Sequence, residues 1–520
     1  MAGESQESAS LAEGNEEPKP GKLERLARWF DTRLGLSYEL FRPAPQYSIN
    51  PFYWLGALAV VAFVIQGVTG IMMMLYYVPS PSLAYPSTLY IFQKVSYGTF
   101  LQTVHLYTAY AMIMLAFMHL MRGYFVSVHK KPREAMWVVG MLMGFITLGF
   151  GFTGYLLPWT IVSKSATDVG LGMVQALPPP VSSFLTFLIV GVGGDAAELL
   201  RFYDLHVVVL PAALLLLLGA KMYMLETHGV AEPATGTPGR IPPAKLGPIP
   251  IFPDVSFYLF ELAALFGAAM LLISVAFPLT LQPEYSAALA GQYTAQPDWY
   301  FLWVYQILKI SAFEEAGLPV ALSVITLIFI VLLLLPFIDR GKTRAIAGRT
   351  KYVTLGAIFV AEVAVLAIWG FVTPGKVIPD EQALVILGGT ALLVTLGSAV
   401  TYRILFRPLN RQGASLPFTP GGPATQASSP RVSIRSASIW TAGVFVALLA
   451  VGTFSMGAAF NALAGLVVAG PLPSGLSTLA VALSGICASA VGSAYLLYRL
   501  DLPNGRIRRR VRAFEVGWAG

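Results

Sequence analysis

The chain has 520 residues, of which 56% are hydrophobic and 12% are charged. Because soluble domains carry about 25% charged residues, this composition excludes an all-soluble enzyme and indicates a polytopic membrane protein. The net charge of +7 does not indicate nucleic acid as a partner, since the basic residues lie in short loops between apolar runs, where they set membrane orientation.

The N-terminal region precedes the apolar part of the chain. Residues 1–21 are rich in Glu, Ser, Gly and Pro without apolar periodicity, which predicts a disordered tail, and they lack the apolar core of a signal peptide. Residues 22–46 alternate basic residues with Leu, Trp and Phe at roughly helical spacing. This pattern predicts an amphipathic helix on the membrane surface, and a solvated charge run is the alternative.

Ten apolar segments follow, each long enough to supply the ~20 helical residues that cross a bilayer. They are expected at 51–77, 100–124, 135–157, 205–225, 256–279, 318–338, 353–373, 382–402, 438–468 and 475–498. With both termini in the cytoplasm, the inner segments hold 29 Lys and Arg and the outer segments hold five. This bias predicts that orientation in a cell (plasma) membrane. The expected fold class is therefore all-α, a polytopic transmembrane helical bundle of about ten spans.

Three segments between the spans are too long to be simple connectors. Two outer loops, 158–204 and 280–317, are rich in aromatic and apolar residues, which predicts structured caps. Residues 403–437 are rich in Pro, Gly, Ser and Thr, which predicts a flexible linker. After it, residues 438–520 form two additional spans and a basic tail, for which we expect lipid or subunit contact rather than chemistry.

The chain has only five histidines, and their positions are informative about function. His105 and His119 are fourteen residues apart on the second span, so at about 100° per residue they share a face to within ~40° and lie ~21 Å apart along the axis. His206 opens the fourth span at the depth of His105, because both spans run from outside to inside. The single cysteine, Cys487, excludes a cysteine cluster. A bis-imidazole haem between His105 and His206 is the obvious candidate, with a plain interhelical hydrogen bond as the alternative.

The inner histidine, His119, needs a partner of its own on the fourth span. That partner is expected about fourteen or fifteen residues beyond His206, and Lys221 occupies the second of these positions. His228 would lie about 33 Å from His206 along a regular helix. This distance is too long for His228 to share a metal with His119 unless the helix breaks. His129 lies in a basic inner loop and is expected to be solvated.

This arrangement resembles the cytochrome b subunit of quinol-oxidising cytochrome bc complexes, a group that includes the chloroplast-type bf complexes. The resemblance covers roughly residues 37–402, and the spacing of His105 and His119 matches the first ligand pair of the family. Two glycine pairs on spans one and three, also fourteen apart, match glycines that let haem planes approach the backbone, with ordinary small-residue helix packing as the alternative. These glycines are Gly56, Gly70, Gly140 and Gly154.

Further segments extend the resemblance. The segment 154–159 resembles the end of the family's third span, and 201–206 resembles the beginning of its fourth. The sequence Pro-Asp-Trp-Tyr at 297–300 matches the family's quinol-site signature Pro-Glu-Trp-Tyr, with Asp in place of Glu. Arg122 also matches. The resemblance implies that Arg122 and Arg201 lie near haem propionates, and interfacial anchoring is the alternative.

The sequence departs from the family pattern at three further positions. Gln102 stands where the family usually carries Arg, which puts propionate pairing at the outer haem in question. Trp54 occupies the place of the cysteine that attaches an extra haem in chloroplast-type members, so that haem is not expected. Lys221 stands where the fourth haem ligand, normally histidine, is found. An amine ligates iron only when neutral, a form that burial beside a metal favours, whereas a lysine that snorkels to the inner surface leaves the haem five-coordinate or absent.

The resemblance also implies an activity. Residues 47–230 are expected to form a four-helix core with two haems, of b type or a modified variant, stacked between spans two and four. Residues 231–402 are expected to form the C-terminal part with the quinol-site loop. Quinol is oxidised at the outer face, one electron passes to a Rieske iron–sulfur protein, and the other passes through the haems to quinone at the inner face. A terminal oxidase or cytochrome c as acceptor and a homodimer are further expectations.

The resemblance assigns roles to residues of the two quinone sites. Asp298 is the expected proton acceptor in an otherwise apolar pocket, with Tyr300 as a hydrogen-bonding or gating partner. The alternative is that Asp298 only caps a helix. Pro297 and Trp299 complete the quinol site. The inner quinone site is expected to be formed by Glu226, His228 and Asp254, although exposed loop residues would show the same pattern.

Two other classes of protein share part of these features. A dihaem quinone-reactive membrane anchor of another respiratory dehydrogenase also places histidines on apolar helices, but it needs neither the 297–300 signature nor the glycine pairs. A haem-free transporter with the histidines as a proton relay would need no metal. The number of haems per chain distinguishes these alternatives.

Overall fold

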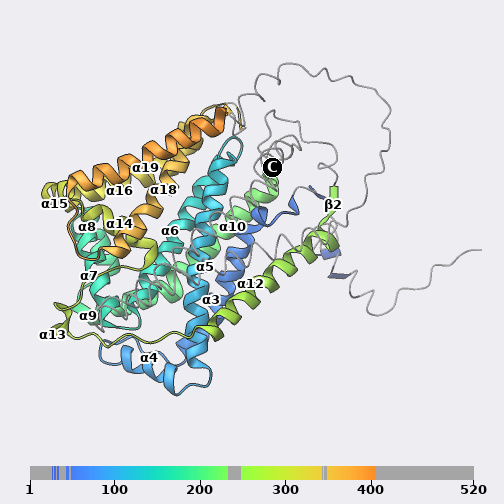
Figure 1. The fold of residues 1–520 in the computed structure, drawn as a ribbon. Helices are drawn as coiled ribbons and strands as arrows, with labels where there is room; N and C mark the ends of the chain where they lie inside the picture. The colour runs from blue at the N-terminus through green and yellow to red at the C-terminus, as the bar shows by residue number, and fades with distance from the viewer. Residues whose placement is uncertain are drawn as a thin grey trace, which may run out of the picture.

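The computed structural model describes residues 48–231, 248–341, 343–344 and 348–403, with a few positions between 26 and 45. Within these residues the protein is a bundle of long helices with short helices gathered at one end (Figure 1). The predicted tail, linker and last two spans lie outside the described residues, as does most of the predicted N-terminal amphipathic helix.

Seven helices in this part of the chain are long and apolar enough to cross a membrane. They are α3 (Leu55–Met74), α5 (Gly98–Phe125), α6 (Glu134–Leu156), the continuous helix of α9 (Gly194–Asp204), η3 (Leu205–Val209) and α10 (Leu210–His228), α12 (Ser256–Ala276), α18 (Thr350–Val372) and α19 (Asp380–Thr401). The apolar helix α16 (Leu318–Leu333) is shorter, and α17 (Leu335–Ile338) follows it after a break. Pro336 explains that break, because it has no N–H to continue the helical ladder. These helices match the first eight predicted spans and confirm an all-α, multi-pass membrane protein.

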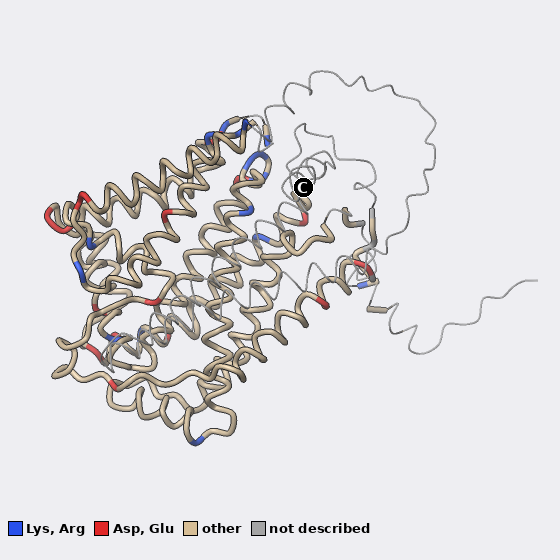
Figure 2. Tube along the Cα trace, viewed as in Figure 1, with Lys and Arg blue, Asp and Glu red and all other residues tan. Residues whose placement is uncertain are grey.

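The two long loops predicted as structured caps contain several short helices. The first contains α7 (Ile161–Gln175), α8 (Val181–Ile189) and α9, and the second contains α13 (Ala287–Ala290), η5 (Trp299–Phe301), α14 (Leu302–Leu308) and α15 (Ser311–Ala316). Together with α4 (Ala84–Gln93), helices α7, α9 and α13 lie at the same end of the bundle (Figure 1). Charged residues gather at helix ends and in loops, and few lie in the middle of the long helices (Figure 2).

Short elements mark the opposite end. Strand β1 (Pro43–Pro45) pairs antiparallel with β2 (Pro248–Pro250), with Ala44 opposite Ile249. The π-helical segment η4 (Ile251–Val255) then leads into α12, and η2 (Pro51–Trp54) leads into α3. Asn50 caps η2, since its side-chain oxygen accepts the N–H of Phe52 at 3.0 Å.

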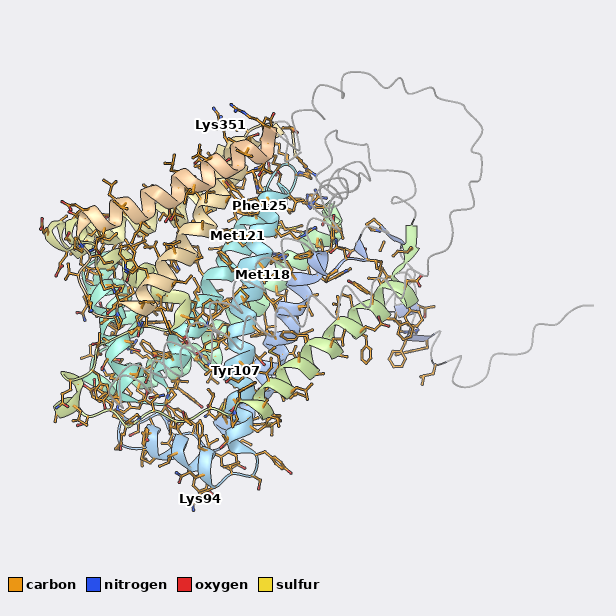
Figure 3. The ribbon with its side chains drawn as sticks, in the orientation of Figure 1. Lys94, Tyr107, Met118, Met121, Phe125 and Lys351 are labelled. Carbon is orange, nitrogen blue, oxygen red and sulfur yellow. The ribbon has the colours of Figure 1, made fainter. Side chains whose placement is uncertain are left out.

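Helix α5 is the central helix of the bundle. Half of the apolar 18-residue stretch of α5 is buried inside the protein, whereas only 6–22% of the corresponding stretch is buried in each of the other six spanning helices. Tyr107, Met118, Met121 and Phe125 mark its course through the middle of the structure (Figure 3). The largest group of buried side chains joins α3, α5, α10 and α12, and it includes Leu55, Leu58, Ala111, Leu115, Leu214, Leu262 and Phe266. Both candidate sites described below include residues of α5.

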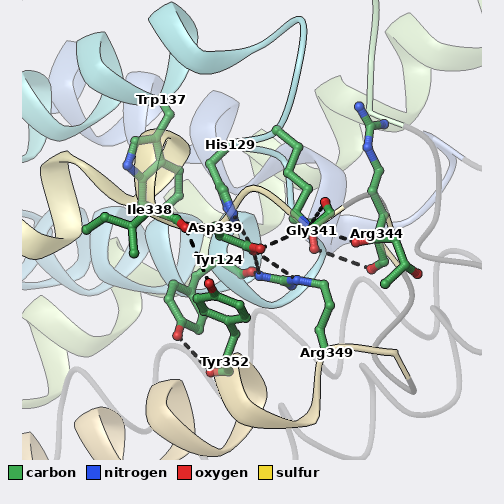
Figure 4. Close-up of polar contacts among 12 residues, drawn as sticks. Tyr124, His129, Trp137, Ile338, Asp339, Gly341, Arg344, Arg349 and Tyr352 are labelled. Carbon is green, nitrogen blue, oxygen red and sulfur yellow. Dashed lines mark hydrogen bonds and ion pairs between the residues drawn. The ribbon is translucent and has the colours of Figure 1, made fainter.

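A buried polar junction joins the α5–α6 loop to the segment after α17 (Figure 4). The carboxylate of Asp339 lies 3.0 Å from His129 Nε2 and 3.1 Å from Lys130 Nζ, and it also accepts hydrogen bonds from Arg349. Burial alone would raise the pKa of Asp339, but hydrogen bonds from these three partners hold it below its ordinary value. His129 is 0% exposed, so the prediction of a solvated histidine is wrong. Its partner is 210 residues away in the sequence, which spacing could not reveal.

Candidate functional site

His105 on α5 and His206 in η3 face each other across the bundle. Their ring centroids lie 6.4 Å apart, with 61° between the ring planes. Each ring is anchored by a threonine of a neighbouring helix, because Thr69 Oγ1 lies 2.8 Å from His105 Nδ1 and Thr153 Oγ1 lies 3.1 Å from His206 Nδ1.

The threonines also determine which ring nitrogen carries the proton. Each hydroxyl donates its own proton to a backbone carbonyl of its helix, that of Ile65 at 2.7 Å for Thr69 and that of Gly149 at 2.8 Å for Thr153. The threonine oxygen therefore accepts a hydrogen bond from the imidazole Nδ1–H. In both rings Nε2 is left with the free lone pair, the state in which a neutral imidazole binds a metal.

The helix that carries His206 contains a π turn at that residue. The N–H of Leu210 bonds the carbonyl of Leu205, five residues earlier. Pro211 favours this irregularity, because it cannot donate to the carbonyl four residues before it and its ring clashes there. A π turn takes up one extra residue in a helix. The fifteen residues from His206 to Lys221 are therefore equivalent to fourteen in a regular helix, which is the spacing of His105 and His119.

The four glycines singled out in the sequence each face one of these four side chains. A Cβ added at Gly70 would lie 3.5 Å from His105 Cε1, and one added at Gly154 would lie 2.5 Å from His206 Cε1. A Cβ added at Gly56 would lie 3.2 Å from His119 Cε1, and one added at Gly140 would lie 2.9 Å from Lys221 Nζ. Three of these are shorter than ordinary van der Waals contact, so the side chains occupy space that only glycine leaves. By contrast, Gly144 on α6 has nothing within 4 Å of an added Cβ.

The surroundings of His119 contain buried polar atoms without partners. Among the described residues, His119 Nδ1 and Arg122 Nε have no hydrogen-bond partner, a rare and costly state for buried groups. The guanidinium of Arg122 lies 3.9 Å from the ring centroid of Tyr53. Lys221 is close enough to His119 for the two to interact electrostatically. His119, Arg122 and Lys221 therefore mark a second polar region inside the bundle.

Arg201 is held by α8. Its guanidinium donates to the carbonyls of Phe187 at 2.8 Å and Leu188 at 3.2 Å, and it lies over the Phe187 ring. These contacts satisfy carbonyls at the end of α8, a common role for a basic side chain. Its role beside a haem propionate stays a prediction.

Asp298 lies in the loop before η5, outside the spanning helices, and is 2% exposed. Its Oδ1 accepts the N–H of Trp299 at 2.8 Å, so it does cap the short helix η5. The hydroxyls of Tyr110 on α5 and of Tyr300 lie near the carboxylate and favour its ionised form. Burial raises the pKa of Asp298 to about 7, although these hydroxyls and the N–H of Trp299 lower it. Capping therefore accounts for only part of its environment.

Two further residues, Tyr110 and Gly151, belong to this site and were not predicted from the sequence. Tyr110, 3% exposed, packs its ring 6.0 Å from that of Trp299 and 6.5 Å from that of Tyr300. Gly151 on α6 makes room for Tyr300, because a Cβ there would lie 2.7 Å from the Tyr300 hydroxyl. A tyrosine and a glycine within apolar helices give no sequence signal of their own.

The indole of Trp299 adds an unused donor to the site. Its Nε1 is buried and has no hydrogen-bond partner in the described part of the chain. Pro297 precedes the carboxylate and is half-buried. The predicted segment 297–300 thus brings a buried carboxylate, a phenol and a free indole N–H together against α5 and α6.

The predicted inner quinone residues lie at the ends of two helices. Glu226 and His228 are exposed at the end of α10, and Asp254 is exposed in η4. His228 Nδ1 lies 2.9 Å from the Met224 carbonyl, and Arg133 donates to the His228 carbonyl at 2.9 Å. These contacts are backbone contacts, and a quinone site here stays a prediction.

Two family models match the chain. The model described as cytochrome b/b6/petB matches residues 42–229, and the model described as cytochrome b(C-terminal)/b6/petD matches residues 289–388. A cytochrome bc complex cytochrome b subunit of Chlorobaculum thiosulfatiphilum is 33% identical over 333 residues, which cover 62% of this chain and 75% of that one. Cytochrome b6 of Heliobacterium modesticaldum is 36% identical over 191 residues, 37% of this chain and 90% of that one. The chain belongs to the cytochrome b/b6 family.

A solved structure supports the fold of this cytochrome b. A chain of a "Hyperthermophilic respiratory Complex III" matches with a TM-score of 0.57 at 22% identity, covering 74% of this chain and 96% of that one. Members of the cytochrome b family are electron-transport proteins, and membership implies b-type haem.

The residues present fit that cofactor. Two imidazoles on opposite sides of one iron, with metal–nitrogen bonds of about 2 Å each, place their ring centroids roughly 6 Å apart, close to the 6.4 Å between His105 and His206. No group of three or more His, Cys, Asp or Glu side chains that could hold a bare metal ion occurs among the described residues. A porphyrin supplies four iron ligands itself, so two facing protein donors are sufficient for haem.

Proposed function

We propose that this cytochrome b oxidises quinol at the outer face of the membrane, as the electron-transferring subunit of a bc-type complex. The main support is the position of Asp298 beside Tyr110 on α5, whose ring packs against those of Trp299 and Tyr300. Tyr110 lies five residues after His105, about 7.5 Å along the same helix. Helix α5 thereby fixes the position of Asp298, which can take a proton, relative to His105, which can hold an electron-accepting haem.

Four side chains are proposed to hold two haems. His105 and His206 hold the outer one through Nε2, and His119 holds the inner one together with Lys221, which is argued below. Haem, when bound, supplies reversible one-electron transfer. Arg122, with its unpartnered buried Nε, is placed to bond a propionate near His119. Arg201 can play that role at the outer haem only if it leaves α8.

Asp298 is the proposed acceptor of a quinol proton. Its pKa of about 7 lies near the working pH, which is the best compromise between being ionised and being basic. Tyr300 orients the carboxylate, and Tyr110 positions it from the opposite side. Trp299 offers its free indole N–H to a quinol oxygen, with Pro297 completing the wall. The apolar surroundings exclude water, so the proton leaves through Asp298 rather than directly to solvent.

Quinol gives up two electrons, and we propose a separate route for each. One electron is proposed to pass to a Rieske iron–sulfur protein, which must be another chain because this one has a single cysteine. A cytochrome c or a terminal oxidase then receives it. The other electron is proposed to reach quinone at the inner face near Glu226, His228 and Asp254. The complex is proposed to be a homodimer in the plasma membrane, with both termini of this chain in the cytoplasm.

The test is haem content and quinol turnover of the complex purified through a tag on this chain. We expect two haems per chain in a pyridine haemochrome assay and quinol-dependent reduction of cytochrome c. Two haems without quinol turnover, but with reduction by a dehydrogenase partner, would favour a dihaem membrane anchor. A protein without haem would favour the transporter alternative and reject the proposal.

A further inference from the structure

We propose that Lys221 is an axial ligand of the inner haem, so that this iron is held between the imidazole of His119 and a primary amine. The inference rests on the proposed function, since it requires that an inner haem is bound. It concerns a ligand pair unlike the two histidines proposed for the outer haem.

Lys221 and His119 occupy matching positions on α10 and α5. Because the π turn at His206 takes up one residue, Lys221 stands on α10 where the helical equivalent of His119 is expected. The two helices thus present donors in two layers, His105 with His206 and His119 with Lys221. Without the π turn, Lys221 would be rotated by about 100° from this position.

Glycines on the flanking helices α3 and α6 treat Lys221 in the same way as the three histidines. Gly70 and Gly56 on α3 face His105 and His119 of α5, and Gly154 on α6 faces His206. Gly140, fourteen residues before Gly154 on the same helix, faces the amine of Lys221 in the same way. The amine therefore occupies the fourth place of a set whose other three members are imidazoles.

The side chain of Lys221 points toward α6 and not toward the end of its own helix. A lysine that snorkels reaches along its helix toward the headgroups. Lys221 instead places its Nζ 2.9 Å from an added Cβ on Gly140, across the interface with α6, and it lies seven residues, about 10 Å, before the end of α10. Within the described ranges no ion pair or hydrogen bond of Lys221 is seen. A charged amine there is costly, whereas ligation makes it neutral.

Bond formation between the Lys221 amine and iron requires no further reactant. The ammonium form of Lys221 loses one proton, and the free nitrogen lone pair forms the bond to iron. The proton leaves to the inner aqueous side. Iron keeps its oxidation state, so no oxidant or reductant is consumed.

Isotope labelling tests the ligand directly in the intact complex. The complex is produced with ¹⁵N-lysine, and hyperfine spectroscopy is recorded on its oxidised low-spin haems. We expect coupling to a ¹⁵N nucleus in the labelled protein and its loss in Lys221→His, which should keep a low-spin inner haem. Lys221→Ala should lose the low-spin signal of the inner haem only. Lys351→Ala, which removes an exposed lysine at the inner end of α18, should leave the coupling intact.

A glycine pair gives a second test that leaves the lysine in place. Gly140→Ala should weaken or remove the ¹⁵N coupling, because its methyl group would collide with the amine. Gly144→Ala on the same helix meets nothing within 4 Å and should change nothing.

Failure of this inference is distinguishable from failure of the proposed function. Two haems per chain without lysine coupling, or an unchanged spectrum in Lys221→Ala, would overturn the lysine ligand while leaving the proposed function standing. A high-spin inner haem in the unmodified protein would overturn it as well. Absence of haem from the purified complex would reject the proposed function first.

Discussion

The buried carboxylate of Asp298 lies near the hydroxyl of Tyr110, and this contact brings the quinol-site loop against the central helix α5. The hydroxyl favours the ionised form of the carboxylate and offsets part of the effect of burial. The two residues are 188 positions apart in the sequence. Tyr110 is thus a positioning residue for the proposed proton acceptor, and removing its hydroxyl should be visible in the pH dependence of turnover.

Tyr110→Phe should shift the acid limb of quinol oxidation to higher pH. Loss of the hydroxyl, which lowers the pKa of Asp298, raises that pKa further, so fewer molecules have an ionised carboxylate at pH 7. We therefore expect turnover to fall at pH 7 by up to about fivefold, within the limit set by the ~1.5–3 kcal/mol of a full bond to a charged group, with recovery in alkaline buffer. Tyr107→Phe, which loses a bond to the Phe277 carbonyl instead, is the control and should not move the pH profile.

Asp298→Asn should abolish the acid limb while both haems stay in place. Burial raises the pKa of Asp298 from 3.8 to about 7, so the base becomes ionised as the pH rises through about 7, and turnover should rise with it. The amide cannot take a proton, and the remaining slow rate should be independent of pH in this range. Asp298→Glu should retain turnover. Unimpaired oxidation in the Asn variant, measured with a haem count on the same sample, would reject the proton role.

The features that could be predicted from sequence are those that local spacing determines. The lengths of the apolar segments predicted the spans, but the break between α16 and α17 falls inside the span expected at 318–338 and was not predicted. The interval from His105 to His119 placed both on one helix face because α5 is regular. The interval from His206 to Lys221 is one residue longer, and only the π turn shows why the two helices still match.

The features that could not be predicted depend on contacts between distant segments. Tyr110 meets Asp298, and His129 meets Asp339, only after the helices have packed. Their residue types are ordinary for an apolar helix and for a basic loop. Gly151 was also invisible, because its importance comes from the Tyr300 hydroxyl that packs against it. Such sites follow from tertiary packing rather than from periodicity.

Thr69→Val should weaken the outer haem site alone. Thr69 accepts the Nδ1–H of His105, and loss of such a partner typically reduces metal affinity about 10–100-fold and makes the imidazole a weaker electron donor. We expect the midpoint potential of the outer haem to rise and that of the inner haem to stay constant in a redox titration. Thr147→Val is a suitable control, because Thr147 bonds only the Met143 carbonyl of its own helix. If the midpoint potential of the outer haem were the same in Thr69→Val and Thr147→Val, that result would argue against haem ligation by His105.

Gly154→Ala should displace the His206 ring. The added methyl carbon would lie 2.5 Å from His206 Cε1, 3.1 Å from its Nδ1 and 3.2 Å from its Nε2, which is far inside van der Waals contact, so the ring must move. The expected result is loss of the low-spin signal of the outer haem, read by optical and magnetic spectra, with the inner haem retained. Gly144→Ala again serves as the neutral comparison. If Gly154→Ala retained both haem signals, the glycine would be explained by helix packing alone.

Asp339→Asn should destabilise the protein without changing either haem spectrum. Its carboxylate is buried and bonds His129, Lys130 and Arg349, so the amide leaves buried cations without their counter-ion, a loss of about 3–5 kcal/mol for a buried pair. We expect a lower Tm of the purified complex in detergent. Asp380→Asn removes an exposed carboxylate that bonds Ser311 and the N–H of Ala312, and its effect should be no more than about 1 kcal/mol. Equal Tm values for the two variants would show that the junction in Figure 4 contributes no more to stability than an exposed cap.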